Sequence, residues 1–307
     1  MKIVYMGNPE FSVAGLKALA DSSHIILTVV TNPPKPQGRG RALHPTPVAR
    51  AAEDLHIPVI PLHDLRDPAF HDSLQRLNPD LFVVVAFRIL PSALIELPGR
   101  GCINLHTSLL PKYRGAAPIQ RALMNGDRET GLTTFLIQPR VDSGDILLQK
   151  PIPIRDSDDF GTLSERLSRL GADLLVETVN RLEKGDIVPQ AQDNSQATPA
   201  PKIRPDDCQI HWDQPARVIH NQIRALSPRP GAFTFWRKYR LKVFQTCPNE
   251  QDFGLPAGHI IIKNDRVLVQ TGSGSLELLA LQREGKKRVS ALEFIRGYAL
   301  KSGDLLG

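Results

Sequence analysis

The 307-residue sequence has no uninterrupted apolar run of about eighteen residues or more, so it predicts no helix that spans a membrane. An apolar segment begins as early as Ile3, which leaves no room for a signal peptide, and we expect a cytoplasmic protein. Cysteine is scarce, and Cys102, Cys208 and Cys247 form no CxxC pair. Neither a disulfide framework nor a zinc site is therefore expected.

Two cofactor signatures are also missing. A lone Gly7 follows the first apolar segment, and the spaced GxGxxG pattern of dinucleotide-binding proteins is absent, so a nicotinamide cofactor is not expected. No cluster of His, Cys and Asp has the spacing of metal ligands, and we expect the chemistry to need no metal.

The charge is unevenly distributed. Residues 1–200 contain 21 Lys and Arg against 22 Asp and Glu, whereas residues 201–307 contain 17 against 10, so the net charge of +6 arises in the C-terminal third. Such an excess favours a polyanionic partner such as a nucleic acid. Solvated surface cations would give the same count, and composition leaves both interpretations open.

Alternating apolar strands and helices predict an α/β domain in the first part of the chain. Strands are expected at residues 2–6, 25–31 and 81–86, and the last of these has the β-branched, continuous apolar character of a parallel strand that is buried on both faces. An amphipathic helix at residues 160–182 would close the domain. We predict a Rossmann-like, mostly parallel sheet within residues 1–185.

A second domain is expected near the C-terminus. Residues 186–207 are rich in Pro, Ala, Gln and Asp and lack periodicity, which predicts a linker. Short strand-like segments follow at the spacing of a small OB-like β-barrel over residues 208–307: 231–235, 241–245, 259–262, 266–270 and 276–282. A barrel of this kind with a basic surface is a common platform for nucleic acids.

Residues 101–121 are the most informative stretch. An apolar strand is expected to end here, and a polar loop separates it from a helix that begins near Pro118. Ligands bind at the carboxyl ends of strands in open parallel sheets, so Asn104, His106 and Ser108 would face a cleft. An Asn amide can donate to a developing oxyanion, and a histidine can carry a proton near neutral pH. A structural histidine after a strand would give the same pattern.

A second segment, residues 141–147, predicts a turn that enters another apolar strand. The turn contains Asp142, whose carboxylate could reach the imidazole of His106.

Taken together, these motifs resemble the folate-dependent formyltransferases. The resemblance lies in Asn-Leu-His-Thr-Ser-Leu-Leu-Pro at residues 104–111, in Tyr-Arg-Gly at 113–115 and in Asp-Ser-Gly-Asp at 142–145. Gly-Ala-Ala-Pro-Ile-Gln at residues 115–120 is similar to the members of the family that act on methionyl-tRNA. The resemblance implies that Asn104, His106 and Asp142 are catalytic, and that tetrahydrofolate contacts Ser108, Leu109, Leu110 and Pro111.

Residues 87–91 fall where this family has a tyrosine-glycine loop against the pterin. The loop is one residue shorter in this chain and lacks the glycine. Phe87 could line the folate pocket, or it could pack in the core as most phenylalanines do, and both interpretations stay open.

An irregular loop is expected at residues 32–45, because four prolines and two glycines disfavour regular structure there. It contains three cations and no acidic residue, which suits phosphate contacts as well as plain solvation. The resemblance implies an insertion loop that engages the acceptor end of tRNA, with Arg39 as its key arginine and with Lys35 and Arg41 as further candidates.

The implied activity is transfer of the formyl group of 10-formyltetrahydrofolate to the α-amino group of initiator methionyl-tRNA by a monomeric enzyme. Two alternatives remain: formylation of an amino-sugar nucleotide with the same cosubstrate, and a nucleic-acid-binding protein with a vestigial folate site. The basic loop and the basic C-terminal region argue against the first, and the intact catalytic residues argue against the second.

Overall fold

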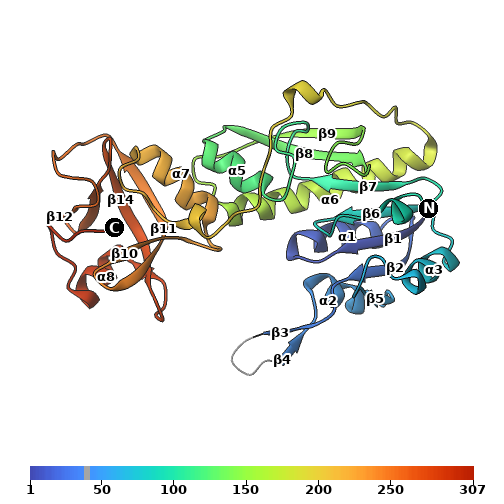
Figure 1. The fold of residues 1–307 in the computed structure, drawn as a ribbon, viewed down its shortest axis with the longest axis horizontal. Helices are drawn as coiled ribbons and strands as arrows, with labels where there is room; N and C mark the ends of the chain where they lie inside the picture. The colour runs from blue at the N-terminus through green and yellow to red at the C-terminus, as the bar shows by residue number, and fades with distance from the viewer. Residues whose placement is uncertain (38–41) are drawn as a thin grey trace. The chain divides into compact units, whose positions relative to one another are not determined.

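The structure is a computed structural model that describes residues 1–37 and 42–307, and the chain divides into two compact units (Figure 1). Unit 1 comprises Met1–Ala116, Glu129–Pro153 and Ser164–Ala200, and unit 2 comprises Ala117–Arg128, Ile154–Leu163 and Pro201–Gly307. The segment predicted as a linker, residues 186–207, belongs to unit 1 up to Ala200 and to unit 2 from Pro201 onward.

Unit 1 is built on a seven-stranded sheet in the order β5-β2-β1-β6-β7-β8-β9. Its strands are β1 (Lys2–Gly7), β2 (Ile25–Thr31), β5 (Val59–Pro61), β6 (Leu81–Val85), β7 (Cys102–His106), β8 (Glu129–Leu136) and β9 (Ile146–Pro153). Neighbouring strands from β5 to β7 are parallel, whereas the pairings of β7 with β8 and of β8 with β9 are antiparallel. The mostly parallel sheet predicted from the sequence is confirmed.

Helices connect and cover these strands: α1 (Val13–Ala20), α2 (Pro47–Asp54), α3 (Pro68–Arg76), α4 (Ser92–Ile95) and α6 (Phe160–Lys184), with one-turn helices η1 (Glu10–Ser12) and η2 (Asn194–Gln196). Thr46 and Asp67 cap α2 and α3 with side-chain oxygens that accept from backbone N–H groups, and a proline occupies the first turn of both helices. Helix α6 runs along the sheet (Figure 1), and Thr178 on it lies 2.8 Å, hydroxyl to hydroxyl, from Thr134 of β8.

The core of the sheet lies around β6, all five residues of which are buried, as expected for a strand covered on both faces. A hydrophobic cluster surrounds it and includes Phe82, Val84, Leu90 and Leu94. Across residues 1–37 and 42–307, no helix is both long enough and apolar enough to cross a membrane.

The prediction of a wholly irregular loop at residues 32–45 was wrong in part. β3 (Lys35–Gln37) and β4 (Ala42–His44) pair as an antiparallel two-stranded ribbon, with Pro36 opposite Leu43. Both strands of such a ribbon are edges, so a proline that lacks an N–H can be accommodated. Lys35 is exposed on β3, and the predicted tRNA contacts Arg39 and Arg41 lie outside the described residues.

Unit 2 contains a six-stranded antiparallel sheet in the order β10-β11-β14-β13-β12, with β15 paired to β14. Its elements are α5 (Pro118–Asn125), η3 (Asp206–Cys208), α7 (Ala216–Leu226), β10 (Ala232–Trp236), β11 (Tyr239–Asn249), β12 (Ile260–Lys263), β13 (Arg266–Gln270), β14 (Ser275–Arg283), β15 (Val289–Ser290) and α8 (Ala291–Tyr298). Each of the five segments predicted as strands overlaps one of these strands.

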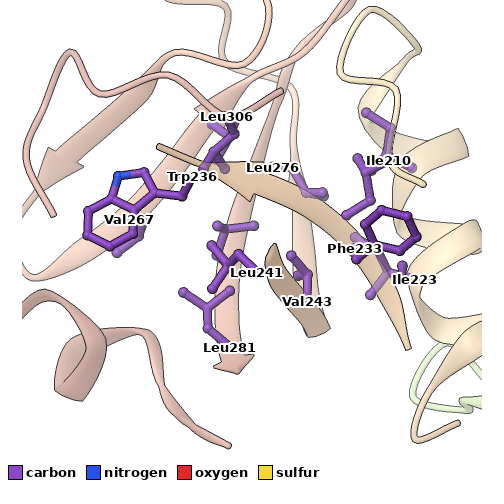
Figure 2. Close-up of a cluster of buried hydrophobic side chains, with 14 of the residues drawn as sticks. Ile210, Ile223, Phe233, Trp236, Leu241, Val243, Val267, Leu276, Leu281 and Leu306 are labelled. Atoms are coloured by element: carbon purple, nitrogen blue, oxygen red, sulfur yellow. The ribbon is translucent and has the colours of Figure 1, made fainter. Parts of the chain in front are cut away.

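The core of unit 2 is a single buried cluster (Figure 2). Leu241 and Leu281 point into it from the strands, beside Trp236, whose indole N–H donates to Asp304 Oδ2 at 3.1 Å. Ile223 of α7 and Phe233 extend the cluster toward the helix. Fully burying side chains of this size contributes about 1.5–3 kcal/mol each, so this cluster is the main source of stability in unit 2.

Candidate active site

Strand β7 places two of the predicted catalytic residues on one face of the sheet. Successive side chains of a strand alternate between faces, so Asn104 and His106 project to the same side, with Cα atoms roughly 7 Å apart. Asn104 is half-buried between Val84 of β6 and Phe135 of β8, the residues opposite it. No residue that the structure describes hydrogen bonds with the Asn104 side chain. Its amide is therefore available to a substrate.

His106 is buried and held by a backbone carbonyl. Its Nε2 lies 2.9 Å from the carbonyl oxygen of Tyr113, and its ring packs edge-to-face against Phe135 with centroids 6.4 Å apart. A carbonyl oxygen can only accept, so Nε2 must carry the hydrogen of this bond. Nδ1 is consequently the ring nitrogen that can take up or release a proton.

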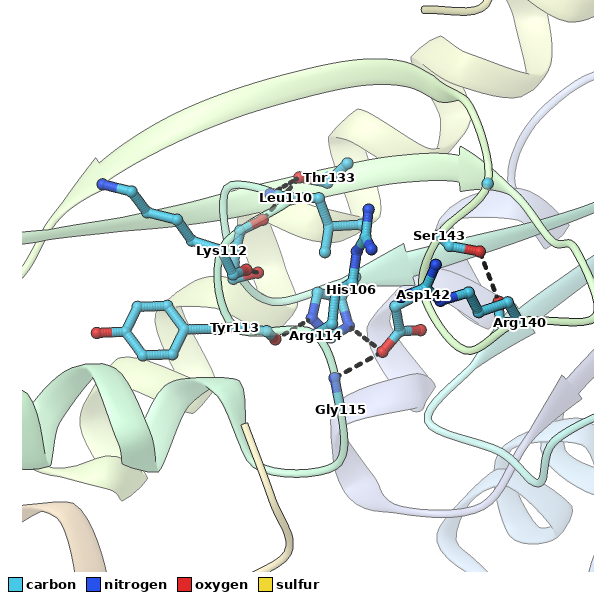
Figure 3. Close-up of polar contacts among 12 residues, drawn as sticks. His106, Leu110, Lys112, Tyr113, Arg114, Gly115, Thr133, Arg140, Asp142 and Ser143 are labelled. Carbon is cyan, nitrogen blue, oxygen red and sulfur yellow. Dashed lines mark hydrogen bonds and ion pairs between the residues drawn. The ribbon is translucent and has the colours of Figure 1, made fainter. Parts of the chain in front are cut away.

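Asp142 comes to this nitrogen from the turn between β8 and β9 (Figure 3). Its Oδ2 accepts from the N–H of Gly115 at 2.8 Å and lies 3.8 Å from Nδ1 of His106. With a neutral imidazole both of these atoms are acceptors, and 3.8 Å is longer than a direct hydrogen bond. A direct hydrogen bond between Nδ1 and Oδ2 would therefore require a proton on one of the two atoms and a closer approach.

Two glycines in the recognised motifs allow the chain to fold this closely. A Cβ on Gly144 would lie 1.6 Å from the carbonyl oxygen of Leu136, and a Cβ on Gly115, where φ is 129°, would lie 2.6 Å from that of Ala200. Contacts this short exclude any side chain. The spacing of these motifs thus reflects backbone packing around Asp142 as well as chemistry.

The run predicted to contact folate forms a loop that is held by hydrogen bonds to Lys112 and to Thr133 of β8. The hydroxyl of Ser108 donates to the carbonyl oxygen of Lys112 at 2.6 Å, and the N–H of Leu110 donates to the hydroxyl of Thr133 at 3.2 Å (Figure 3). Ser108 and Leu110 are buried, whereas Leu109 and Pro111 are half-buried. Contact with folate stays a prediction for these four residues.

Phe87 is half-buried and packs against the hydrophobic cluster around β6. It follows the carboxyl end of that strand, after Ala86, whose φ is 49°. Its role against the pterin also stays a prediction.

A segment that no motif marked, residues 190–200, holds the loop that ends at Gly115. Thr198 accepts at its hydroxyl from the N–H of Tyr113 at 2.9 Å, and at its carbonyl oxygen from the N–H of Arg114 at 2.8 Å. Ala200 N–H donates to the carbonyl oxygen of Arg114 at 2.6 Å. Lack of periodicity predicted a linker in this region, and only the fold reveals that part of it packs behind the site.

Arg114 lies in the same loop, between Tyr113 and Gly115. Burial lowers the pKa of its guanidinium and the charge of Arg140 lowers it further, whereas Asp142 raises it. Arginine keeps its charge despite such shifts. Within the part of the chain that the structure describes, no group of three or more His, Cys, Asp or Glu residues could hold a metal ion.

Comparison with known proteins adds an independent line of evidence. The family model described as formyl transferase matches residues 1–179, and that described as formyl transferase, C-terminal domain, matches residues 202–299. Methionyl-tRNA formyltransferase from Citrifermentans bemidjiense is 43% identical over 100% of this chain and 96% of its own length. The Moorella thermoacetica enzyme of the same name is also 43% identical, over 100% and 99%.

Solved structures share the fold at lower identity. Methionyl-tRNA formyltransferase from Clostridium thermocellum is 18% identical with a TM-score of 0.57, covering 91% of this chain and 99% of that one. An N-formyltransferase from Helicobacter canadensis, solved with folinic acid and dTDP-3-aminofucose, is 20% identical with a TM-score of 0.69, covering 91% and 98%. Because one family model covers more than half of the sequence and the curated relatives match it from end to end, the chain belongs to the formyl transferase family, within the group of methionyl-tRNA formyltransferases.

Proposed function

We propose that this protein transfers the formyl group of 10-formyltetrahydrofolate to the α-amino group of initiator methionyl-tRNA, giving N-formylmethionyl-tRNA for the initiation of translation. It acts as a monomer in the cytoplasm. The observation that carries the proposal is the approach of Asp142 Oδ2 to within 3.8 Å of His106 Nδ1. Asn104 lies on the same face of β7 as His106, and none of the described residues hydrogen bonds with its amide. Relatives that are 43% identical over the full chain and bear the name of this activity support it.

The reaction makes three demands on the protein. It must stabilise the carbonyl oxygen of the formyl group as that oxygen gains negative charge, take a proton from the attacking amine, and return a proton to the departing N10. Asn104 meets the first demand, since a preorganised amide donor of this kind contributes about 3 kcal/mol to the transition state.

His106 and Asp142 meet the other two demands as a unit. Because Nε2–H is bonded to Tyr113, proton exchange is confined to Nδ1, and Nδ1 faces the carboxylate. A proton taken from the amine can be held between the two groups and passed to N10.

The two substrates are held by different parts of the chain. The folate is contacted by Ser108, Leu109, Leu110, Pro111 and Phe87. Arg39, with Lys35 and Arg41, contacts the phosphates of the tRNA acceptor end.

Unit 2 supplies a further basic surface for the tRNA. The Arg240 guanidinium stacks 3.5 Å from the ring centroid of Phe233, and that of Arg283 stacks 3.6 Å from the ring of Tyr239. Cations fixed on rings in this way lose little conformational freedom when they meet a phosphate.

An assay with two amines tests the proposal. The purified protein is incubated with 10-formyltetrahydrofolate and with either methionylated initiator tRNA or an amino-sugar nucleotide. Formylation of the tRNA alone is expected. Formylation of the sugar nucleotide alone would overturn the proposal, and so would the absence of transfer to either amine.

A further inference from the structure

Gln192 lies outside every motif described above, yet its side chain contacts both the turn that contains Asp142 and the loop that ends at Gly115. It is 9% exposed, and its Nε2 donates to the carbonyl oxygens of Asp142 at 3.0 Å and of Gly144 at 2.7 Å. Its Oε1 accepts from Arg114, at 3.0 Å from Nε and at 2.6 Å from Nη2. One buried amide thus joins the turn that holds Asp142 to the loop that ends at Gly115.

This amide has no hydrogen-bonding capacity left for a substrate. A glutamine offers two N–H donors and two acceptor lone pairs, and these four contacts use all of them. Buried polar groups that are fully paired fix the geometry of their neighbours, because any displacement leaves a buried donor or acceptor unpaired.

The turn needs such a restraint. Asp142 has a φ of 48°, in the left-handed region that disfavours residues with a side chain. The two carbonyl groups that flank Ser143 point toward the same side chain, that of Gln192. Without these two bonds, both carbonyl groups would lose the side chain that holds the turn in this conformation.

Through its Oε1 atom, which accepts from Arg114, Gln192 also restrains the loop that holds the catalytic pair. Arg114 lies between Tyr113, whose carbonyl oxygen holds His106, and Gly115, whose N–H holds the carboxylate of Asp142. Gln192 therefore restrains the partners of both catalytic groups through one amide.

We propose that Gln192 is a positioning residue that sets the distance between Asp142 and His106 and acts on the reaction only by setting this distance. The inference rests on the proposed catalytic role of this pair. Gln192 contacts neither substrate.

The variant Gln192→Glu isolates this role. It keeps the size of the side chain and an acceptor for Arg114, but it replaces both N–H donors with an oxygen that repels the carbonyls of Asp142 and Gly144. We expect kcat to fall by up to about 100-fold, as a displacement of about 1 Å can cause, with KM for both substrates within about twofold.

Gln190→Glu is the matched control. It introduces the same charge two residues earlier, at an exposed side chain for which the described residues provide no hydrogen bond. We expect wild-type kcat from this variant. Thermal unfolding of both variants separates misplacement from loss of fold.

A double-mutant cycle distinguishes positioning from general support. If Gln192 acts only by setting the distance between Asp142 and His106, adding Gln192→Glu to Asp142→Asn should lower kcat by less than about twofold further. Effects that multiply would overturn the proposal, and so would a wild-type kcat for Gln192→Glu. If Asp142→Asn alone left kcat unchanged, the catalytic role of the pair would fail instead, so the two failures differ.

Should the Glu variant not fold, Gln192→Asn replaces it in the same cycle. Its amide is one methylene too short to reach both Arg114 and the turn. The same outcomes then apply.

Discussion

The Nδ1 atom of His106 faces the Oδ2 atom of Asp142 across 3.8 Å, while the opposite nitrogen of the ring is bonded to the carbonyl oxygen of Tyr113. This arrangement fixes both the tautomer and the direction of the imidazole. The ring nitrogen that faces the carboxylate is therefore the one that is free to accept a proton.

Replacing Asp142 with Asn removes the proton acceptor and keeps the shape of the side chain. We expect kcat to fall by about 10²- to 10⁴-fold, with KM for 10-formyltetrahydrofolate changed far less. Steady-state kinetics with initiator methionyl-tRNA measures this. Asp186→Asn, the same change at an exposed position, should behave as wild type. Near-normal turnover by the Asp142 variant would remove the carboxylate from the mechanism.

Replacing Asn104 with Asp puts a negative charge where the oxyanion develops. We expect a loss of more than about 100-fold in kcat. The melting temperature should change little, because the Asn104 side chain loses no hydrogen bond to the described protein. Kinetics and thermal unfolding of one preparation test both statements. A loss of activity that only follows a loss of folded protein would speak against the assigned donor.

Removing a cation from the loop tests the assignment of Arg39. Arg39→Ala should raise KM for the tRNA and leave KM for the folate unchanged. The slope of log affinity against log salt concentration should decrease by about one, as for a lost phosphate contact. Filter binding at several salt concentrations measures the slope, and Lys35→Ala provides the comparison. An unchanged slope and an unchanged rate would refute the loop assignment.

Gly144→Ala should destabilise unit 1, because the new Cβ would lie 1.6 Å from the carbonyl oxygen of Leu136. A loss of about 3 kcal/mol or more in the free energy of unfolding is expected. Gly99→Ala is the control, since among the described residues no atom outside its chain neighbours lies within 4 Å of the added Cβ, and its effect should stay within about 0.5 kcal/mol. Chemical unfolding followed by circular dichroism compares the two. Equal stabilities would contradict the close packing described for this turn.

His220 should make unit 2 less stable in acid. Burial lowers its pKa to about 4 from the ordinary 6.5, aided by Arg224 and Arg217. Folding thus favours the neutral ring, and the unfolded chain binds the proton more strongly. This contribution is complete above pH 6.5, is lost as pH falls toward about 4, and amounts to roughly 2–3 kcal/mol.

Tryptophan fluorescence can follow this effect in unit 2 alone. The chain has two tryptophans, Trp212 and Trp236, and both lie in the core of unit 2. In urea unfolding of the wild type, the free energy of unfolding should fall as the pH is lowered from 6.5 to 4. His220→Asn keeps a polar group near Thr246 and should show a flatter profile over this range. Equal profiles for the two proteins would rule out His220 as the source.

Local patterns in the sequence predicted the strands and the turn on which the candidate site residues lie. The apolar run of β6 predicts a strand that is buried on both faces. Polar residues after an apolar segment predict the end of β7. The assignment of Asp142 to a turn is confirmed, because glycine beside short polar residues favours turns wherever they occur.

Contacts between distant segments could not be predicted in this way. Gln192 is separated from Arg114 by 78 residues, and its neighbours carry neither periodicity nor a motif. The carbonyl oxygen of Tyr113 that orients His106 is a backbone group, which every residue type provides. The number of prolines and glycines did not predict the β3–β4 ribbon, because both of its strands are edges and an edge strand accommodates a proline.

The packing of residues 190–200 behind the loop that ends at Gly115 also sets the order in which the enzyme is completed during synthesis. A growing chain that has reached the end of β9 already contains Asn104, His106 and Asp142. It still lacks Gln192, Thr198 and Ala200, the partners that hold the loop and the turn in place. The arrangement of these three side chains seen in the structure thus draws on contacts that become available only once residue 200 has been synthesised.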